Sequence, residues 1–258
     1  MWLIEEMGLE KFRERAEEEM AAHVPQFKFE AAQGHSQPWN HGFRNVIGVH
    51  PQRQEGLSWV GIHVPVGRLS ADECNAIADL ADKYSGGEIR LTVDQNIVLP
   101  NVNNNMIASL LSEPTLSHGQ RLSVNPGNIV GGVVSCTGSQ FCPLALVETK
   151  NSIDSIARKL QTVVDIPRQV RIHMTGCPNS CGQAQLADIG LMGAPAKKAD
   201  ASGAMKAVPG VNIFVGGKIG EEAHLAGEPT VKGIPLTEDD LVPVLVKLLV
   251  DNFGATPK

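Results

Sequence analysis

The sequence lacks three features that would each indicate a class of protein. No apolar run approaches the ~18 residues of a membrane-spanning helix, positive charge is not in excess, and there are only five cysteines among 258 residues. The formal net charge of -6 predicts no binding to nucleic acid or to an anionic membrane. An odd number of cysteines, without an apolar secretion signal, argues against a disulfide framework. We therefore expect a soluble, globular protein.

Four of the five cysteines are concentrated in two short segments. Cys136 and Cys142 bound the segment CTGSQFC, and Cys177 and Cys181 lie within TGCPNSCGQ. Each pair follows directly on an apolar run that predicts a strand, so folding can bring four thiolates together. The fifth, Cys74, lies on a predicted helix and is interpreted as a buried packing residue.

The spacing of the four thiols leaves three interpretations open. Structural zinc sites usually have two to four residues inside each pair, whereas the two pairs here enclose five and three. Unliganded cysteines are often buried, but these four lie among Gly, Pro, Asn and Ser, which favour turns. An iron-sulfur cluster held by four thiolates is the interpretation that both loops favour.

Local patterns divide the chain into two parts, residues 1–120 and 121–258. The first twenty residues predict a helix that ends near Pro25, and residues 23–56 predict a long connecting segment. The remaining elements of the first part are a strand over 58–66, a helix over 69–87 with Ser70 and Glu73 as a capping box, one or two strands over 88–102 and a short helix over 105–112. This β-α-β-β-α order predicts an α+β layer.

The second part begins with an apolar run that leads into the first cysteine. It continues with a helix over 143–164, a strand over 168–174 that leads to the second cysteine pair, strands over 186–193 and 210–217 separated by a loop, and a terminal helix over 236–254 capped by Thr237 with Asp240. Leu146, Ile153, Ile156 and Leu160 mark one apolar face of the first of these helices.

Several segments resemble the C-terminal half of the ferredoxin-dependent assimilatory nitrite reductases, within the sirohaem and [4Fe-4S] nitrite/sulfite reductase family. The segments that carry the resemblance are CTGSQFC, ETK, TGCPNSCGQ, ADIGLMG, LTVDQNIVLPNV and GVHPQRQEGLSWVGIHVPVGRLSADE. They extend the resemblance over nearly the whole chain. It implies an α+β fold in which a helix, a linker and a ferredoxin-like half-domain (1–120) precede a [4Fe-4S] and sirohaem domain (121–258).

The resemblance also implies roles for individual residues. Cys136, Cys142, Cys177 and Cys181 would hold the [4Fe-4S] cluster, and Cys181 would also be the axial thiolate of the sirohaem iron. Further candidates for contact with the cofactors are Gln95, Asn96 and Asn179. Basic residues that could contact sirohaem carboxylates are Arg44, Arg53, Arg90, Arg121 and Arg171. The catalytic residues stay unknown, because the family's anion-binding residues are expected in an N-terminal half that this sequence lacks.

The implied activity is the six-electron reduction of nitrite to ammonium in nitrate assimilation, with reduced ferredoxin as electron donor. Assimilatory sulfite reduction and a non-catalytic iron-sulfur or zinc module are the alternatives. We expect the chain alone to be inactive, and the full-length enzyme to be a monomer of the plastid stroma or the prokaryotic cytoplasm. Acidic ferredoxins dock on positive surfaces, for which the candidates are Lys150, Arg158, Lys159 and Arg168.

Overall fold

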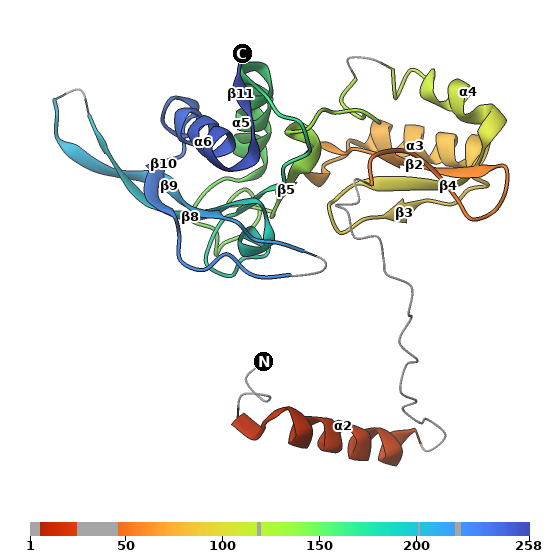
Figure 1. Ribbon diagram of the computed structural model, residues 1–258, viewed down its shortest axis with the longest axis horizontal. Helices are drawn as coiled ribbons and strands as arrows, with labels where there is room; N and C mark the ends of the chain where they lie inside the picture. Colours follow the sequence, from red (N-terminus) through yellow and green to blue (C-terminus); the bar gives the residue numbers. More distant parts are fainter. Residues whose placement is uncertain (1–5, 25–45, 118–119, 201, 220–222) are drawn as a thin grey trace. The chain divides into compact units, whose positions relative to one another are not determined.

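The computed structural model describes residues 6–24, 46–117, 120–200, 202–219 and 223–258 (Figure 1). Contacts divide the chain into two units, residues 1–42 and 43–258. The first unit contains helix α2 (Leu9–His23), which confirms the helix predicted there, and none of its residues is buried. It ends at His23, and Val24 is not helical, because the ring of Pro25 disfavours helical dihedral angles in the preceding residue. The predicted division of the chain after residue 120 stays a prediction.

A four-stranded antiparallel sheet forms the first half of the larger unit. Its strand order is β1-β2-β4-β3, and its elements are β1 (Gly48–Pro51), β2 (Leu57–Ile62), β3 (Arg90–Leu91) and β4 (Ile97–Asn103). Helices α3 (Ala71–Tyr84) and α4 (Ile107–Leu111) lie over one face of this sheet (Figure 1). Short 3-10 turns η1 (Pro65–Gly67) and η2 (Asn104–Met106) connect these elements. This arrangement is the predicted α+β layer.

Strand β1 corrects the prediction of a connecting segment over residues 23–56. Residues 25–45 lie outside the described part of the chain, but 48–51 pair with β2 in a regular antiparallel register. The sequence of β1 contains Gly48 and Pro51, which disfavour strands on local grounds. Pairing with the apolar strand β2 therefore decides its conformation.

Helix α3 begins at the predicted capping box. The Ser70 side chain accepts a hydrogen bond from the Glu73 amide (3.2 Å), and the Ser70 amide donates to Glu73 Oε2 (2.8 Å). Both bonds satisfy amides that the first turn of a helix leaves without partners. The apolar face of α3 packs on β2 and β4. The apolar core formed there includes Val60, Ile62, Ile77, Leu80, Leu99 and Leu110.

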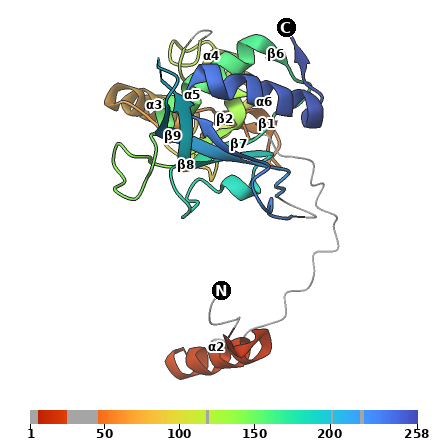
Figure 2. The same cartoon turned by 90° about the vertical axis from the view of Figure 1, so that its left-hand side faces the viewer.

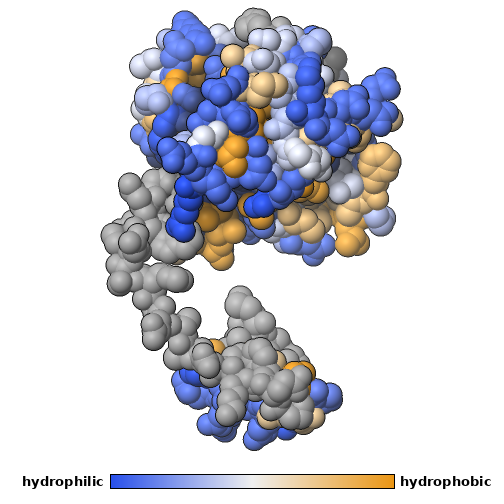
Figure 3. Space-filling model, turned by 90° about the vertical axis from the view of Figure 1, so that its right-hand side faces the viewer, coloured by the Kyte–Doolittle hydropathy of each residue, from blue (hydrophilic) through white to orange (hydrophobic). Residues whose placement is uncertain are grey.

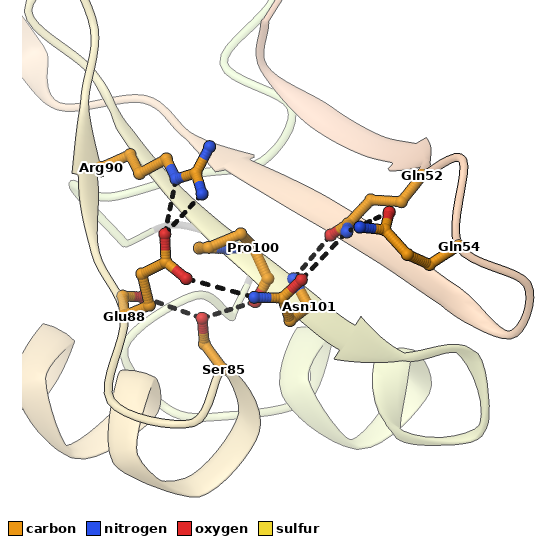
Figure 4. Close-up of polar contacts among 7 residues, drawn as sticks. All are labelled: Gln52, Gln54, Ser85, Glu88, Arg90, Pro100 and Asn101. Atoms are coloured by element: carbon orange, nitrogen blue, oxygen red, sulfur yellow. Dashed lines mark hydrogen bonds and ion pairs between the residues drawn. The ribbon is translucent and has the colours of Figure 1, made fainter.

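Polar contacts connect the β1–β2 hairpin to β4 (Figure 4). Gln52 Nε2 donates to Asn101 Oδ1 (3.0 Å), and Gln52 Oε1 accepts from the Asn101 amide (2.6 Å). Glu88 accepts from the Asn101 side chain (3.2 Å) and from Arg90 Nε (2.6 Å). Gln52 thus bonds to Asn101 through both atoms of its side-chain amide, once to the backbone N–H and once to the side-chain oxygen.

The surface seen in Figure 3 is mainly hydrophilic, and apolar side chains gather along its lower border. Leu91 on β3 and Val93 just after it are 81% and 91% exposed. Strand β3 is an edge strand of only two residues. A short edge strand offers few backbone groups to another chain, which limits sheet-to-sheet association.

A five-stranded mixed sheet forms the second half, in the order β10-β9-β8-β7-β5. Its strands are β5 (Val133–Ser135), β7 (Ile172–Thr175), β8 (Ile189–Ala199), β9 (Met205–Val215) and β10 (Val231–Pro235). Strands β5, β7 and β8 are parallel, and the remaining pairs are antiparallel. Helices α5 (Lys150–Val163) and α6 (Glu238–Phe253) lie against each other over the sheet (Figure 2).

Shorter elements complete this half. They are the 3-10 turns η3 (Val130–Gly132) and η4 (Ala184–Leu186) and a small sheet of β6 (Val164–Asp165) with β11 (Thr256–Pro257). Its apolar core joins the two helices to the sheet and includes Ile153, Ile156, Leu160, Ile172, Leu191, Leu241 and Leu245.

In the described part of the chain, no helix is both long and apolar enough to cross a membrane.

Two predicted boundaries in this half are wrong. The helix predicted from residue 143 begins only at Lys150, because the Glu148 carboxylate caps it by accepting from the amides of Asn151 (3.1 Å) and Ser152 (2.9 Å). Leu146 therefore precedes the helix, and it is 54% exposed. The loop predicted between residues 193 and 210 is mostly strand, since β8 and β9 pair without interruption from Ile189 to Ala199.

Glu73 is expected to make a pH-dependent contribution to stability. A hydrogen-bonded ion pair with Arg121 (2.8 Å), helped by the bonds of the capping box, lowers the pKa of Glu73 to about 2. Because the folded pKa lies below the unfolded one, the contribution is present above pH ~4.5 and is lost as the pH falls toward 2. Replacing Glu73 with Gln (E73Q) should lower the free energy of unfolding by about 1 kcal/mol at pH 7, measured by urea unfolding of the full-length protein.

The control is D79N, because Asp79 is exposed on the same helix. It should leave the free energy of unfolding nearly unchanged at every pH. A difference between E73Q and the wild type that stays constant from pH 7 to pH 3 would contradict the assigned pKa.

Candidate iron-sulfur site

The first cysteine loop leaves the carboxyl end of β5. Cys136 follows directly on the strand, and its amide donates to the Met174 carbonyl of β7 (3.0 Å). The chain then turns, with the Cys142 amide donating to the Gly138 carbonyl (3.0 Å). Thr149 Oγ1 donates to the Cys136 carbonyl (2.8 Å). The loop is therefore tied at its start both to the sheet and to the residue preceding α5.

The second cysteine loop leaves the carboxyl end of the neighbouring strand β7. Its first residue, Gly176, donates its amide to Cys136 Sγ (3.2 Å) and accepts from the Leu146 amide (2.8 Å). The two cysteine loops are thus in direct contact. An amide that donates to a cysteine sulfur is the kind of contact that stabilises thiolate ligands and tunes an iron-sulfur cluster.

Two glycines allow the backbones around the second loop to approach closely. A Cβ at Gly182 would lie 2.3 Å from the Met174 carbonyl oxygen, and a Cβ at Gly193 would lie 2.3 Å from the Gly176 carbonyl oxygen. Real side chains do not fit at such distances, so both positions require glycine. Gly193 lies on β8, and its role was not visible in the sequence because it depends on a contact across the sheet.

The cysteines differ in exposure. Cys177 is buried, Cys136 and Cys142 are half-buried, and Cys181 is exposed. Cys74 is also exposed, so its prediction as a buried packing residue is wrong. The buried face of α3 is formed by Ile77, Leu80, Ala81 and Tyr84, and Cys74 lies outside it.

The thiols do not form a cage for a single metal ion. In the described ranges, no three His, Cys, Asp or Glu side chains gather around one possible ion position. Four thiolates on one zinc ion would need sulfur atoms about 4 Å apart, given Zn–S bonds of about 2.3 Å. In a [4Fe-4S] cluster each thiolate binds a different iron atom, so the sulfurs are spread around a larger group. Four soft ligands from two touching loops, one of them accepting an amide N–H, fit such a cluster.

His173 connects the second loop to the interior. It lies on β7, is 1% exposed, and its Nδ1–H donates to the Gly182 carbonyl (3.0 Å). Burial, and next the nearby Arg171, lowers the pKa of His173 to about 4, so the ring is neutral at pH 7 and Nε2 is an acceptor. Nε2 has no hydrogen-bond partner among the described residues. His173 lines a cavity of about 10 Å³ that also borders Asp94, Gln169 and Arg171 and has room for about one water molecule.

The three amide candidates occupy different places. Gln95 bonds through both side-chain atoms to Ser135, the residue before Cys136. Asn96 is buried, and its Oδ1 accepts from the Val64 amide (3.0 Å) and from His63 Nδ1 (3.2 Å). Asn179 is exposed between the two cysteines of the second loop. Contact of these three with a cofactor stays a prediction.

Two of the five basic candidates are engaged in ion pairs within the protein. Arg90 pairs with Glu88 (2.6 Å), and Arg121 pairs with Glu73. Arg171 is buried, donates to the Leu186 carbonyl (2.6 Å), and has a pKa lowered chiefly by burial. Arg53 is exposed, and Arg44 lies outside the described residues.

The proposed docking residues are spread along α5 and beyond it. Lys150 donates to the carbonyls of Val66 and Ser135, and burial lowers its pKa. Arg158 pairs with Asp154 on the exposed face of the helix, beside exposed Lys159. Arg158 also lines a cleft of about 690 Å³ at the far end of α5 from the cysteine loops, together with His63, Arg121, Gln161 and Lys258. Arg168 pairs with Asp188.

Comparison with protein families gives two matches along the chain. Residues 50–116 match the nitrite/sulfite reductase ferredoxin-like half domain, and residues 127–254 match the nitrite and sulphite reductase 4Fe-4S domain. All four clustered cysteines fall within the second match. The mixed helix-and-sheet architecture is the expected fold of these domains.

The names of individual similar proteins agree with these two domain matches. The chain is 49% identical over 261 residues to a chloroplastic ferredoxin–nitrite reductase from Zea mays, and 48% identical over 255 residues to a ferredoxin–nitrite reductase from Synechococcus elongatus. It covers 43% and 46% of the length of these two proteins, and they cover 100% and 99% of the chain. Among solved structures, the Mycobacterium tuberculosis NirA protein matches 97% of the chain with a TM-score of 0.74 at 27% identity, covering 44% of that protein.

A crystal structure of dissimilatory sulfite reductase I matches 76% of the chain with a TM-score of 0.60 at 15% identity, which shows a shared fold. The two consecutive domain matches, together with close relatives over the full length of the chain, identify its family. The chain belongs to the nitrite and sulfite reductase family.

Proposed function

We propose that the protein reduces nitrite to ammonium in nitrate assimilation, with electrons from reduced ferredoxin. The observation that carries the proposal is the pair of touching cysteine loops at the carboxyl ends of β5 and β7, with the Gly176 amide on Cys136 Sγ. The names of the relatives, ferredoxin–nitrite reductase, supply the substrate and the electron donor. The chain spans less than half the length of these relatives, so the activity belongs to the full-length protein.

The four loop cysteines are the proposed ligands of a [4Fe-4S] cluster. Cys136 and Cys142 are half-buried and Cys177 is buried, as ligands with no other task would be. Cys181 is exposed, which supports its proposed second role as the thiolate that also binds the iron of sirohaem. The family is one that carries both cofactors.

The reaction explains why two linked cofactors are useful. Nitrite takes up six electrons and eight protons to give ammonium and two water molecules, while ferredoxin delivers one electron at a time. When bound, the cluster and sirohaem supply storage of electrons and an iron atom that binds the anion. The residues of this chain hold the thiolates in place, donate an amide N–H to a thiolate sulfur, and place the Lys150 cation near Cys136.

Remaining assignments follow from the same proposal. Gln95, Asn96 and Asn179 are candidate contacts of the cofactors, and Lys150, Arg158, Lys159 and Arg168 are candidate contacts of ferredoxin.

The relatives are chloroplastic in plants and occur in cyanobacteria, which supports a plastid or prokaryotic location. We propose a monomer for the full-length enzyme.

The test of the function is ammonium formation by the full-length protein. With nitrite and either reduced ferredoxin or reduced methyl viologen, we expect ammonium to form at a rate proportional to the enzyme concentration. The kcat/KM of the enzyme for nitrite should be at least about tenfold above its kcat/KM for sulfite. The chain of residues 1–258 alone should form no ammonium after reconstitution. Faster reduction of sulfite to sulfide would instead assign the full-length protein to the sulfite-reducing branch.

A second prediction concerns the ligands. Replacing Cys136, Cys142, Cys177 or Cys181 with Ser in the full-length protein should cause loss of most cluster iron, because a serine oxygen is a poorer ligand for iron than a thiolate. The measurement is bound iron and acid-labile sulfide per chain. C74S is the matched control, because Cys74 is exposed and lies on a different element, and it should keep all its iron.

Cys181 should also be distinguishable from the other three. Only C181S should change the absorption bands of sirohaem in any protein that keeps a cluster, because only its thiolate is proposed to bind the sirohaem iron. Full iron content in C142S would reject the ligand set. A selective change of the sirohaem bands in C177S would place the bridge on the other cysteine of that loop.

A further inference from the structure

Strand β5 forms one edge of its sheet, and this leaves part of its backbone without a strand partner. Its only neighbour among the described strands is β7. The Cys136 amide points toward β7, where it donates to the Met174 carbonyl (3.0 Å). Because neighbouring residues of a strand point their backbone groups to opposite sides, the N–H and C=O groups of Ser135 point away from β7. Ser135 has no exposed surface, so these groups cannot be satisfied by bulk water.

The side chain of Gln95 satisfies both groups. Gln95 Nε2 donates to the Ser135 carbonyl (2.7 Å), and Gln95 Oε1 accepts from the Ser135 amide (3.2 Å). A single side-chain amide thus makes the pair of hydrogen bonds that a neighbouring strand would make. Gln95 comes from the turn before β4, in the ferredoxin-like half-domain, so this pair joins the two matched domains.

Lys150 supports the same point. Its ammonium group donates to the Ser135 carbonyl (3.2 Å) and to the Val66 carbonyl, which lies in the half-domain. The Ser135 carbonyl therefore accepts from two side chains, one neutral and one charged. Hydrogen bonds from charged donors are stronger than those from neutral ones.

The backbone around Gln95 is arranged for this contact. Gln95 has a φ angle of 64°, which is uncommon for a residue with a side chain. Gly67 lies against it, and a Cβ at Gly67 would be 2.8 Å from Gln95 Cβ. A larger residue at position 67 would push the Gln95 side chain away from Ser135.

We propose that Gln95 is a positioning residue, which completes the open edge of β5 and so fixes the place from which Cys136 reaches the cluster. The proposal rests on the proposed function only for the role of Cys136 as a ligand. It differs from the prediction that Gln95 contacts a cofactor, because here Gln95 acts through the backbone of Ser135.

The test is Q95L in the full-length protein, which keeps a branched side chain, one bond shorter, and removes both hydrogen bonds. The matched control is Q52L. Gln52 also bonds through both atoms of its side-chain amide, to the backbone N–H and the side-chain oxygen of Asn101, in the same half-domain and on a strand that leads to no cysteine (Figure 4). Hydrogen exchange of the 133–136 backbone, measured by mass spectrometry, should be about tenfold faster in Q95L than in Q52L or the wild type.

Two further readouts address the thiolate itself. In cluster-free protein, alkylation of Cys136 should be about tenfold faster in Q95L, whereas alkylation of buried Cys177 should be unchanged. In protein with its cluster, a chelator should remove iron several-fold faster from Q95L, and the electron paramagnetic resonance spectrum of the reduced cluster should differ from that of Q52L. A purely structural role would not select one cysteine or change the spectrum.

A second variant keeps the proposal testable if Q95L does not fold. Q95E retains an acceptor for the Ser135 amide but places a carboxylate oxygen against the Ser135 carbonyl, so exchange and alkylation should fall between those of the wild type and Q95L. Equal rates of hydrogen exchange at residues 133–136 and of Cys136 alkylation in the Gln95 and Gln52 variants would overturn the proposal. Faster exchange in Q95L, with unchanged iron release and an unchanged spectrum of the reduced cluster, would also overturn it. Exchange and alkylation need no nitrite, so an inactive wild-type protein would reject the proposed function without deciding the role of Gln95.

Discussion

The parallel pairing of β5 with β7 is the constraint on which the candidate site depends. The register Val133↔Ile172 to Ser135↔Met174 makes both strands end at the same edge of the sheet. Each strand continues directly into a cysteine loop, so residues about forty positions apart in the sequence become neighbours. A parallel pair needs a crossover connection, and α5 provides it by packing Ile153, Ile156 and Leu160 into the core. Breaking this pairing would separate the loops, whatever their own sequences favour.

Contacts from outside the strand pair then fix the loops. Gly193 and Gly182 allow backbone to lie against backbone beneath the second loop. Thr149 holds the first loop from the start of α5, and Gln95 holds it from the other domain. The cysteine site is therefore not a property of two motifs alone, because residues of the half-domain and of three strands determine where the thiols lie.

The sequence predicted the parts of this account that depend on local pattern. The capping box of Ser70 and Glu73, the cap at Thr237 and the strands before each cysteine pair all follow from residues near in sequence, and the structure confirms them. Strand β1 and the parts of β8 and β9 that lie between residues 193 and 210 were missed, because pairing with a neighbour, not their own pattern, makes them strands. Cys74 was misplaced because the buried face of α3 begins one turn later. The bonds of Gln95 to Ser135 join residues forty positions apart, and no local signal in the sequence indicates them.

The most direct test of the central claim is X-ray diffraction from crystals of the full-length protein at energies on both sides of the iron absorption edge. The account predicts anomalous density for four iron atoms, each bonded to one of the four loop cysteines, and for a fifth iron atom bonded to Cys181. Density for a single zinc ion among these thiols would contradict the account, as would an iron cluster held by other residues.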